Sequence, residues 1–195
     1  MQENETLQAP EPVQKSLRPR LRNALSWLRD LAFSVLIAVV LIVFIYQPVK
    51  VEGTSMLPTL EDTDRIFINK FTYRFGLGAI ERGDTVVFWY PEDTTKSYIK
   101  RVIGLPGDLI RIDAGQVFVN DQPLAEDYVE GDFKDQMSWP TSHSDRKVPR
   151  DSYFVLGDHR NSSSDSRSWG FVPRENIYGK AVFVYWPLRK LGRLR

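Results

Sequence analysis

The chain has 195 residues, a length that suits one domain of ordinary size plus a short additional segment. Its 26 basic residues nearly balance its 25 acidic residues, so the overall charge does not indicate a nucleic-acid partner. The absence of cysteine excludes disulfides, thiolate metal sites and a cysteine nucleophile. The only histidines are His143 and His159, which excludes a three-histidine zinc site, and neither an HExxH pattern nor a glycine-rich phosphate loop occurs.

The N-terminal part of the chain divides into a polar tail and an apolar segment. The first 22 residues are polar, carry three prolines and lack an apolar period, which is typical of a mobile tail. Leu31–Tyr46 holds sixteen residues without a charge. A membrane span needs about 20 residues, and Trp27 on one side and Val49 on the other extend the apolar length. We therefore predict a tail over residues 1–26 and one transmembrane helix over residues 27–48.

Two other interpretations of the apolar segment fit less well. A helix buried in a protein core usually has a polar face, and this segment has none. A cleaved secretory signal should be followed by a small-x-small site, but Gln47-Pro48-Val49-Lys50 follows here. Cations predict the orientation: five precede the uncharged run that starts at Leu31, and the fifteen residues after this run hold only Lys50. The positive-inside rule places the N-terminus in the cytoplasm and residues from 49 onward on the extracytoplasmic side.

The remainder, residues 49–195, alternates short apolar runs with turn residues and lacks helical periodicity. This pattern predicts a mainly β fold with an antiparallel β domain, in which residues 121–150 form a loop-rich insertion. Asp113-Ala114-Gly115 predicts a hairpin turn between two of the strands. The cations at 189–195 are interpreted as a solvated tail in preference to a lipid-contacting segment. The predicted strands are Asp64–Phe71, Thr85–Tyr90, Ser97–Ile103, Leu109–Ile112, Val117–Val119, Tyr153–Leu156 and Ala181–Trp186.

Three stretches concentrate groups that can carry chemistry. Gly53–Leu60 places Ser55 in a glycine- and proline-bearing turn, where a hydroxyl can project outward beside free backbone N–H groups. Lys100–Asp108 begins with two adjacent cations in a predicted strand. Alternation sends Arg101 to the opposite face from Lys100, so one cation can be desolvated while the other stays in water. Gly157–Val172 combines hydroxyl, carboxylate and guanidinium groups. Each stretch alone would also fit an ordinary turn, an edge-strand cation or a solvated loop.

Together, the three stretches resemble the boxes of bacterial type I signal peptidases, the leader peptidase family with a Ser–Lys dyad. The matching motifs are Gly-x-Ser-Met-x-Pro-Thr-Leu, then Lys-Arg-aliphatic-aliphatic-Gly-x-Pro-Gly-Asp, then Gly-Asp-His with a later Ser, Asp and Arg. The order of the motifs and their position after a single N-terminal span also match. The resemblance covers the apolar segment and most of residues 50–186, and the insertion 121–150 matches least.

The resemblance implies a membrane-bound serine endopeptidase that removes signal peptides from exported preproteins and cuts after small residues. It implies that Ser55 is the nucleophile, that Lys100 is the general base and that Ser163 hydrogen-bonds the lysine. Asp165 and Arg167 correspond to a structural ion pair, and Asp158 to a further carboxylate of the third box. Met56, Leu60, Tyr98 and Ile99 are candidate walls of the pockets for small residues. It implies no metal and no organic cofactor, and the expected partners are preproteins and the lipid bilayer.

Two positions depart from the family pattern. Gly53 stands where some members have a hydroxyl residue that helps to hold the oxyanion, and His159 replaces an asparagine. The oxyanion site would then depend on the Ser55 backbone N–H. Burial against apolar side chains, with Tyr98, Ile99 and Met56 as available walls, would lower the lysine pKa so that the amine can accept the serine proton.

Three rival hypotheses remain distinguishable. A Ser–His–Asp hydrolase would use His159 with Asp158 or Asp165. A self-cleaving repressor-type Ser–Lys protein would need a DNA-binding domain. A non-catalytic binding module tethered to a membrane would process no preprotein. The sequence predicts no oligomeric state.

Overall fold

The computed structural model describes residues 18–44, 46–71, 78–135, 139 and 146–194. The chain divides into two compact units, residues 1–40 and residues 41–195, and each is considered by itself. The predicted tail up to residue 17 and His143 lie outside the described residues.

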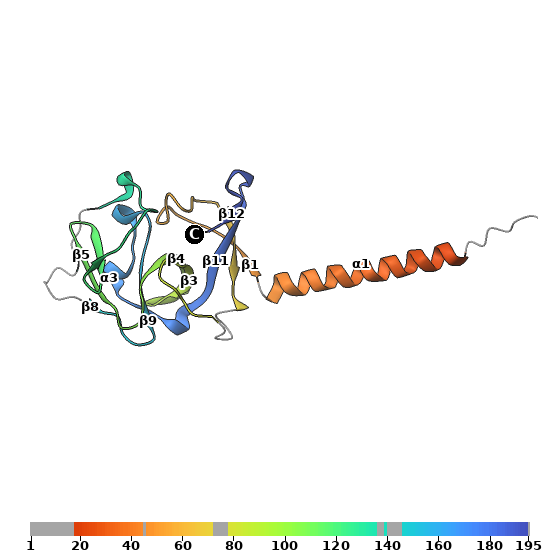
Figure 1. Cartoon of the computed structure of the whole chain (residues 1–195), viewed down its shortest axis with the longest axis horizontal. Coiled ribbons are helices and arrows are strands. Elements are labelled where there is room, and N and C mark those ends of the chain that lie inside the picture. Colours follow the sequence, from red (N-terminus) through yellow and green to blue (C-terminus); the bar gives the residue numbers. More distant parts are fainter. Residues whose placement is uncertain (1–17, 45, 72–77, 136–138, 140–145, 195) are drawn as a thin grey trace, which may run out of the picture. The chain divides into compact units, whose positions relative to one another are not determined.

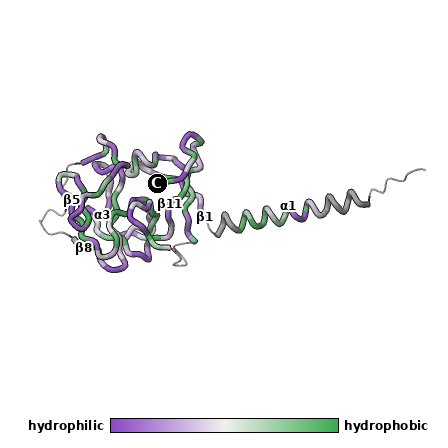
Figure 2. Tube along the Cα trace, in the orientation of Figure 1, coloured by the Kyte–Doolittle hydropathy of each residue, from purple (hydrophilic) through white to green (hydrophobic). Residues whose placement is uncertain are grey.

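The described part of the first unit lies in the helix α1, Arg18–Phe44 (Figure 1). It begins inside the segment predicted as a tail. Its described side chains from residue 27 to residue 40 are exposed, and they are mostly hydrophobic after the Arg29–Asp30 pair (Figure 2). Within the described part of the chain, no helix has both the length and the apolar character that are needed to cross a membrane.

The last residues of the predicted span lie in a strand. β1, Tyr46–Lys50, pairs with β2, Arg65–Asn69, and Pro48 lies opposite Phe67. Proline lacks a backbone N–H and blocks an α-helix, whereas an edge strand tolerates it. The helix therefore ends before the residue at which the apolar run of the sequence ends.

The second unit is built from two antiparallel sheets, which confirms the prediction of a mainly β fold (Figure 1). In the larger sheet of the described residues the strand order is β1-β2-β11-β3-β4-β9-β10, with β12 paired to β11. The smaller sheet has the order β7-β6-β5-β8. The strands not yet given are β3 Thr85–Tyr90, β4 Asp93–Gly104, β5 Leu109–Asp113, β6 Gln116–Val119, β7 Gln122–Pro123, β8 Arg146–Lys147, β9 Ser152–Leu156, β10 Val172–Pro173, β11 Ile177–Trp186 and β12 Gly192–Arg193.

The strand pattern of the sequence is recovered because alternate residues are buried. In β2, Ile66 and Ile68 are fully buried while their neighbours are not. The predicted hairpin joins β5 and β6, and its turn residues Ala114 and Gly115 have φ values of 44° and 82°. Two successive positive φ angles match the twist of a tight hairpin, and glycine adopts them without strain.

Short elements connect the strands. The described part of residues 121–150 contains β7, β8 and one 3₁₀ turn, η1. The loop between β9 and β10 carries η2 and a four-residue helix, α3, and it holds the third motif. The bounds are η1 Gly131–Phe133, η2 Arg160–Ser162, α3 Ser166–Trp169, η3 Arg174–Asn176 and η4 Leu188–Lys190.

The C-terminal segment is not a free tail, contrary to the sequence-based expectation. Lys190, in η4, lies 3.0 Å from Glu61 and 3.0 Å from Asp64, and β12 pairs with β11. The carboxylates come from the loop that follows the first motif, 126 residues away from Lys190 in the case of Asp64. Such a long-range pair is not visible in the local sequence pattern.

Candidate active site

The first motif forms a loop between β1 and β2 that is held by hydrogen bonds between its own residues. Gly53 adopts a φ of 89°, and its N–H donates to Asp62 at 2.9 Å. The N–H of Leu60 donates to the carbonyl of Met56 at 2.8 Å, which makes a single helical turn just after Ser55. Glycine permits this backbone reversal because it has no Cβ. The loop thereby holds Ser55 partly exposed at its bend.

Lys100 approaches Ser55 from the neighbouring strand β4. Its Nζ lies 2.6 Å from the Ser55 Oγ, and the lysine is only 4% exposed. Burial lowers the Lys100 pKa from its ordinary value to about 8, although the negative charges of Asp165 and Asp158 oppose the shift. About a tenth of the amine is therefore neutral at pH 7 and can accept a proton from the hydroxyl.

Strand alternation predicted that one of the two adjacent cations stays in water, but Arg101 is buried as well as Lys100. It is 2% exposed, its guanidinium binds Asp158 through two hydrogen bonds of 2.8 and 2.7 Å, and it lies 4.0 Å from the centre of the Tyr128 ring. A guanidinium can be buried when a carboxylate matches its fork geometry. The partner is 57 residues away, so the sequence around Arg101 does not reveal it.

Asp158 joins the nucleophile loop to the sheet. Besides Arg101, it accepts a hydrogen bond of 2.6 Å from Thr59 Oγ1, on the same loop as Ser55. Its side chain is fully buried, so the ion pair and the hydroxyl satisfy a carboxylate that would otherwise be unstable there. Thr59 and Arg101 were not among the predicted supporting residues, although both lie in the quoted motifs.

Asp165 and Arg167 are brought together, as the resemblance implies. Asp165 precedes α3 and accepts hydrogen bonds from the Arg167 backbone N–H at 3.2 Å and from Arg167 Nε at 2.8 Å. Its other oxygen accepts from the Gly157 N–H at 3.1 Å. Arg167 also pairs with Asp135 and donates to the Arg160 carbonyl. The arrangement fixes the loop that follows β9.

Ser163 does not make the hydrogen bond expected of it. Its Oγ is buried and has no hydrogen-bond partner among the described residues, and the amine of Lys100 lies against Ser55. Ser163 instead packs against Gly157. A Cβ at Gly157 would lie 2.2 Å from the Ser163 Oγ and 2.4 Å from the Ser55 carbonyl oxygen. Gly157 is thus required for the close packing of the third motif against the nucleophile loop.

A cleft of about 480 Å³ opens beside the pair. Tyr98 and Ile99 line it, as expected of substrate-binding residues. Met56 and Leu60 do not, which corrects the prediction for these two: they are 1% and 0% exposed and belong to the hydrophobic core. The helical turn that links them directs both side chains inward. The residues around the cleft are Val49, Lys50, Val51, Glu52, Ser55, Ile66, Val87, Ser97, Tyr98, Ile99, Lys100, Ser164 and Tyr178.

His159 contacts the backbone of the loop that carries Ser55. Its Nδ1 lies 3.0 Å from the Thr54 carbonyl, its N–H donates to the Ser55 carbonyl at 3.1 Å, and its ring packs edge-on against Phe133. The neighbouring Asp158 is bound to Arg101 and Thr59. Over the described residues no Ser–His–Asp relay is formed, and no group of three histidines and carboxylates is placed to hold a metal ion.

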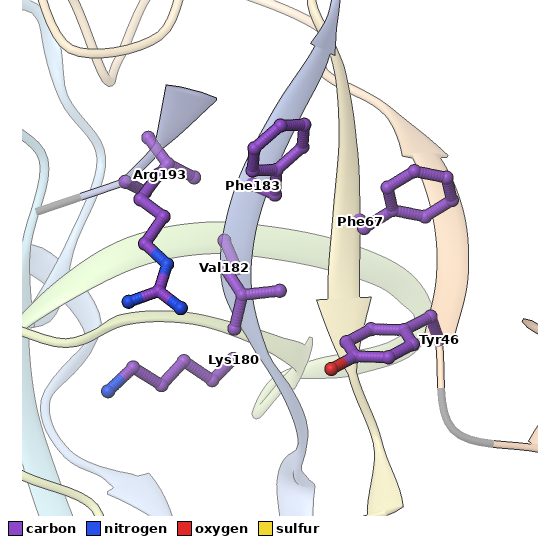
Figure 3. Close-up of a pocket in the computed structure, with 8 residues that line it drawn as sticks. Tyr46, Phe67, Lys180, Val182, Phe183 and Arg193 are labelled. Atoms are coloured by element: carbon purple, nitrogen blue, oxygen red, sulfur yellow. The ribbon is translucent and has the colours of Figure 1, made fainter. Parts of the chain in front are cut away.

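Another cavity, of about 740 Å³, lies elsewhere (Figure 3). Tyr46, Phe67 and Phe183 line it beside Lys180 and Arg193, from strands β1, β2, β11 and β12. Tyr46 and Phe67 alternate with Gln47 and Ile66, so they point to the opposite face of the sheet from the cleft. Neither Ser55 nor Lys100 borders this cavity.

Comparison with known proteins assigns the family. The family model described as "Signal peptidase, peptidase S26" matches residues 24–186. The chain belongs to this family of signal peptidases.

Relatives in several bacteria are similar over most of their length. "Signal peptidase I" of Leptolyngbya laminosa is 38% identical over 97% of this chain and 93% of its own. "Probable signal peptidase I-2" of Synechocystis sp. is 39% identical over 87% of this chain and 78% of its own. "Signal peptidase I T" of Bacillus subtilis is 33% identical over 94% of this chain and 96% of its own. The chain is therefore an enzyme of the hydrolase class.

Proposed function

We propose that the chain is a signal peptidase I that cleaves signal peptides from preproteins with Ser55 as nucleophile and Lys100 as general base. The observation that carries the proposal is the 2.6 Å separation of the Lys100 Nζ and the Ser55 Oγ. The burial of Lys100 supports it further, because a lowered pKa makes the amine a proton acceptor.

The reaction follows from these two groups. Neutral Lys100 removes the proton of Ser55 as the Oγ attacks the scissile carbonyl carbon, which forms a tetrahedral oxyanion. The Ser55 N–H is the expected backbone donor for that oxyanion. The C–N bond then breaks, and protonated Lys100 returns its proton to the departing amine. In the second half Lys100 activates a water molecule, which hydrolyses the ester and regenerates Ser55.

Substitutions separate this mechanism from a histidine-dependent one. We expect Ser55→Ala and Lys100→Ala to abolish processing of a preprotein with an alanine-rich cleavage region, whereas His159→Asn retains most of it. The measurement is the amount of mature product formed by the purified chain. Loss of activity in the histidine variant together with activity in the lysine variant would contradict the dyad, and processing by Ser55→Ala would contradict the proposed function.

We further propose that α1 attaches the enzyme to a membrane, with the N-terminus in the cytoplasm and the catalytic unit on the extracytoplasmic side. The uncharged run of residues 31–46 and the exposed apolar side chains along α1 support the attachment. In membranes extracted with alkaline carbonate, the full chain should stay in the pellet. A chain that begins at residue 46 should be released. Release of both would contradict the proposal.

A further inference from the structure

A second groove, of about 470 Å³, begins where the cleft ends. Tyr178 borders both, on one side with Ser55 and Lys100 and on the other with Gln47 and Trp89. Its hydroxyl is 2.9 Å from the Ser97 Oγ, at the rim of the cleft. The residues around the groove are Gln47, Lys70, Trp89, Arg174, Glu175, Ile177 and Tyr178.

Strand alternation places the groove and the cleft on one face of the sheet. Gln47 is two residues from Val49 in β1, and Trp89 is two residues from Val87 in β3, while Val49 and Val87 line the cleft. Side chains at i and i+2 of a strand share a face. Trp89 lies opposite Ser97, and Val87 lies opposite Ile99. Strands β3 and β4 therefore both lead from the cleft to the groove in the same direction.

That direction leads away from the reacting groups. β1 runs toward Ser55 and β4 runs toward Lys100, so Gln47 and Ser97 both precede the site along their strands. Ser97 is three residues before Lys100, which corresponds to about 10 Å along a strand. Three residues of an extended substrate cover the same length. For an extended substrate that runs parallel to β4, the groove therefore begins at roughly the fourth residue before the cut.

The groove has the chemistry of an apolar peptide site with one hydrogen-bond acceptor. Trp89 is 42% exposed, and its ring packs on that of Tyr178 with 4.7 Å between the centroids and 31° between the ring planes, so a pair of aromatic rings borders the groove. Gln47 Oε1 is buried and lacks a hydrogen-bond partner among the described residues, although a buried carbonyl oxygen ordinarily has a donor. A peptide N–H would supply it.

We infer that this groove binds the apolar segment of the preprotein that precedes its cleavage region, at about the fourth to the sixth residue before the cut. The inference rests on the proposed function and extends it beyond the small residues next to the scissile bond. Trp89 is then a specificity-determining residue that contributes to binding of long substrates.

Two peptides with the same cleavage region test the inference on the purified full chain. One begins three residues before the cut, and the other carries three additional leucines at the fourth to the sixth position before the cut. With the unchanged chain the long peptide should have a KM about tenfold lower, from the apolar area that it buries. In Trp89→Ala this ratio should fall close to one. Trp186→Ala is the matched control, because Trp186 is 51% exposed on β11 outside the groove, and it should keep the ratio.

Two outcomes would overturn the inference: equal KM values for the two peptides with the unchanged chain, or a KM ratio that is preserved in Trp89→Ala. A preserved ratio with an equal loss of activity for both peptides would indicate that Trp89 has a structural role only. Failure of the unchanged chain to cleave either peptide, or cleavage by Ser55→Ala, would instead reject the proposed function.

Discussion

Lys100 is a base only when it has lost its proton, so its burial controls the pH range of the enzyme. The pKa is lowered to about 8, so the neutral fraction rises with pH and reaches one half near that value. We expect kcat/KM to increase about tenfold per pH unit well below pH 8 and to level off above it. A pH profile of the unchanged chain measures this. A profile that is flat between pH 6 and pH 8 would contradict a proton-accepting lysine.

The placement of a single side chain could be predicted where one short motif contains the chemistry. It could not be predicted where the burial of the side chain depends on a partner far away in the sequence. Ser55 and Lys100 lie in separate motifs, yet the motifs themselves mark both. The burial of Arg101 depends on Asp158, and the inward position of Met56 depends on the helical turn of its loop. Neither follows from strand alternation, which is the rule that the sequence offered for placing these side chains.

The loop after β9 depends on the missing side chain of Gly157. A Cβ there would approach both the Ser163 Oγ and the Ser55 carbonyl oxygen to less than 2.5 Å, so the nucleophile loop would have to move. We expect Gly157→Ala to lower kcat at least 100-fold, because a displacement of about 1 Å disrupts a reacting geometry. Steady-state kinetics, with circular dichroism to show that the fold persists, provide the measurement.

Gly131→Ala is the matched control for that substitution. A Cβ at Gly131 has nothing within 4 Å, and its φ is not positive. Full activity in Gly131→Ala and a large loss in Gly157→Ala are expected together. Normal kinetics in both variants would show that the nucleophile loop tolerates the displacement.

Strands were the most predictable elements. β3 was predicted with its observed bounds, and β5 and β6 form the expected hairpin, because both depend on residues close together in the sequence. The sheet order was not predictable in the same way. β2 lies beside β11, and β11 lies beside β3, so the neighbours come from opposite ends of the catalytic unit. Local alternation shows that a strand exists but does not identify its partners.

Across the whole catalytic unit, Lys190 ties the C-terminal segment to the loop that carries Ser55. Asp64 is 2% exposed, and its Oδ2 accepts hydrogen bonds from Lys190 and from the Glu61 N–H. Lys190→Met leaves this carboxylate without its cation, so we expect the free energy of unfolding to fall by about 1–3 kcal/mol. Urea denaturation measures the change.

Arg189→Met is the control at the adjacent position. Arg189 also contacts Glu61, but its side chain is 71% exposed and solvent screens the pair, so little change is expected. Similar losses in the two variants would mean that the burial of Asp64 is not what makes Lys190 important.

The position of Lys100 and Arg101 side by side in β4 has a consequence for the accuracy of folding. β4 is paired on both sides, with β3 and with β9. A shift of β4 by one residue would reverse every side chain and present Arg101 to Ser55. Because a guanidinium does not release its proton under ordinary conditions, such a molecule would be folded, charged at the reacting position and inert. Correct strand pairing is therefore a condition of catalysis in this enzyme, as well as of its stability.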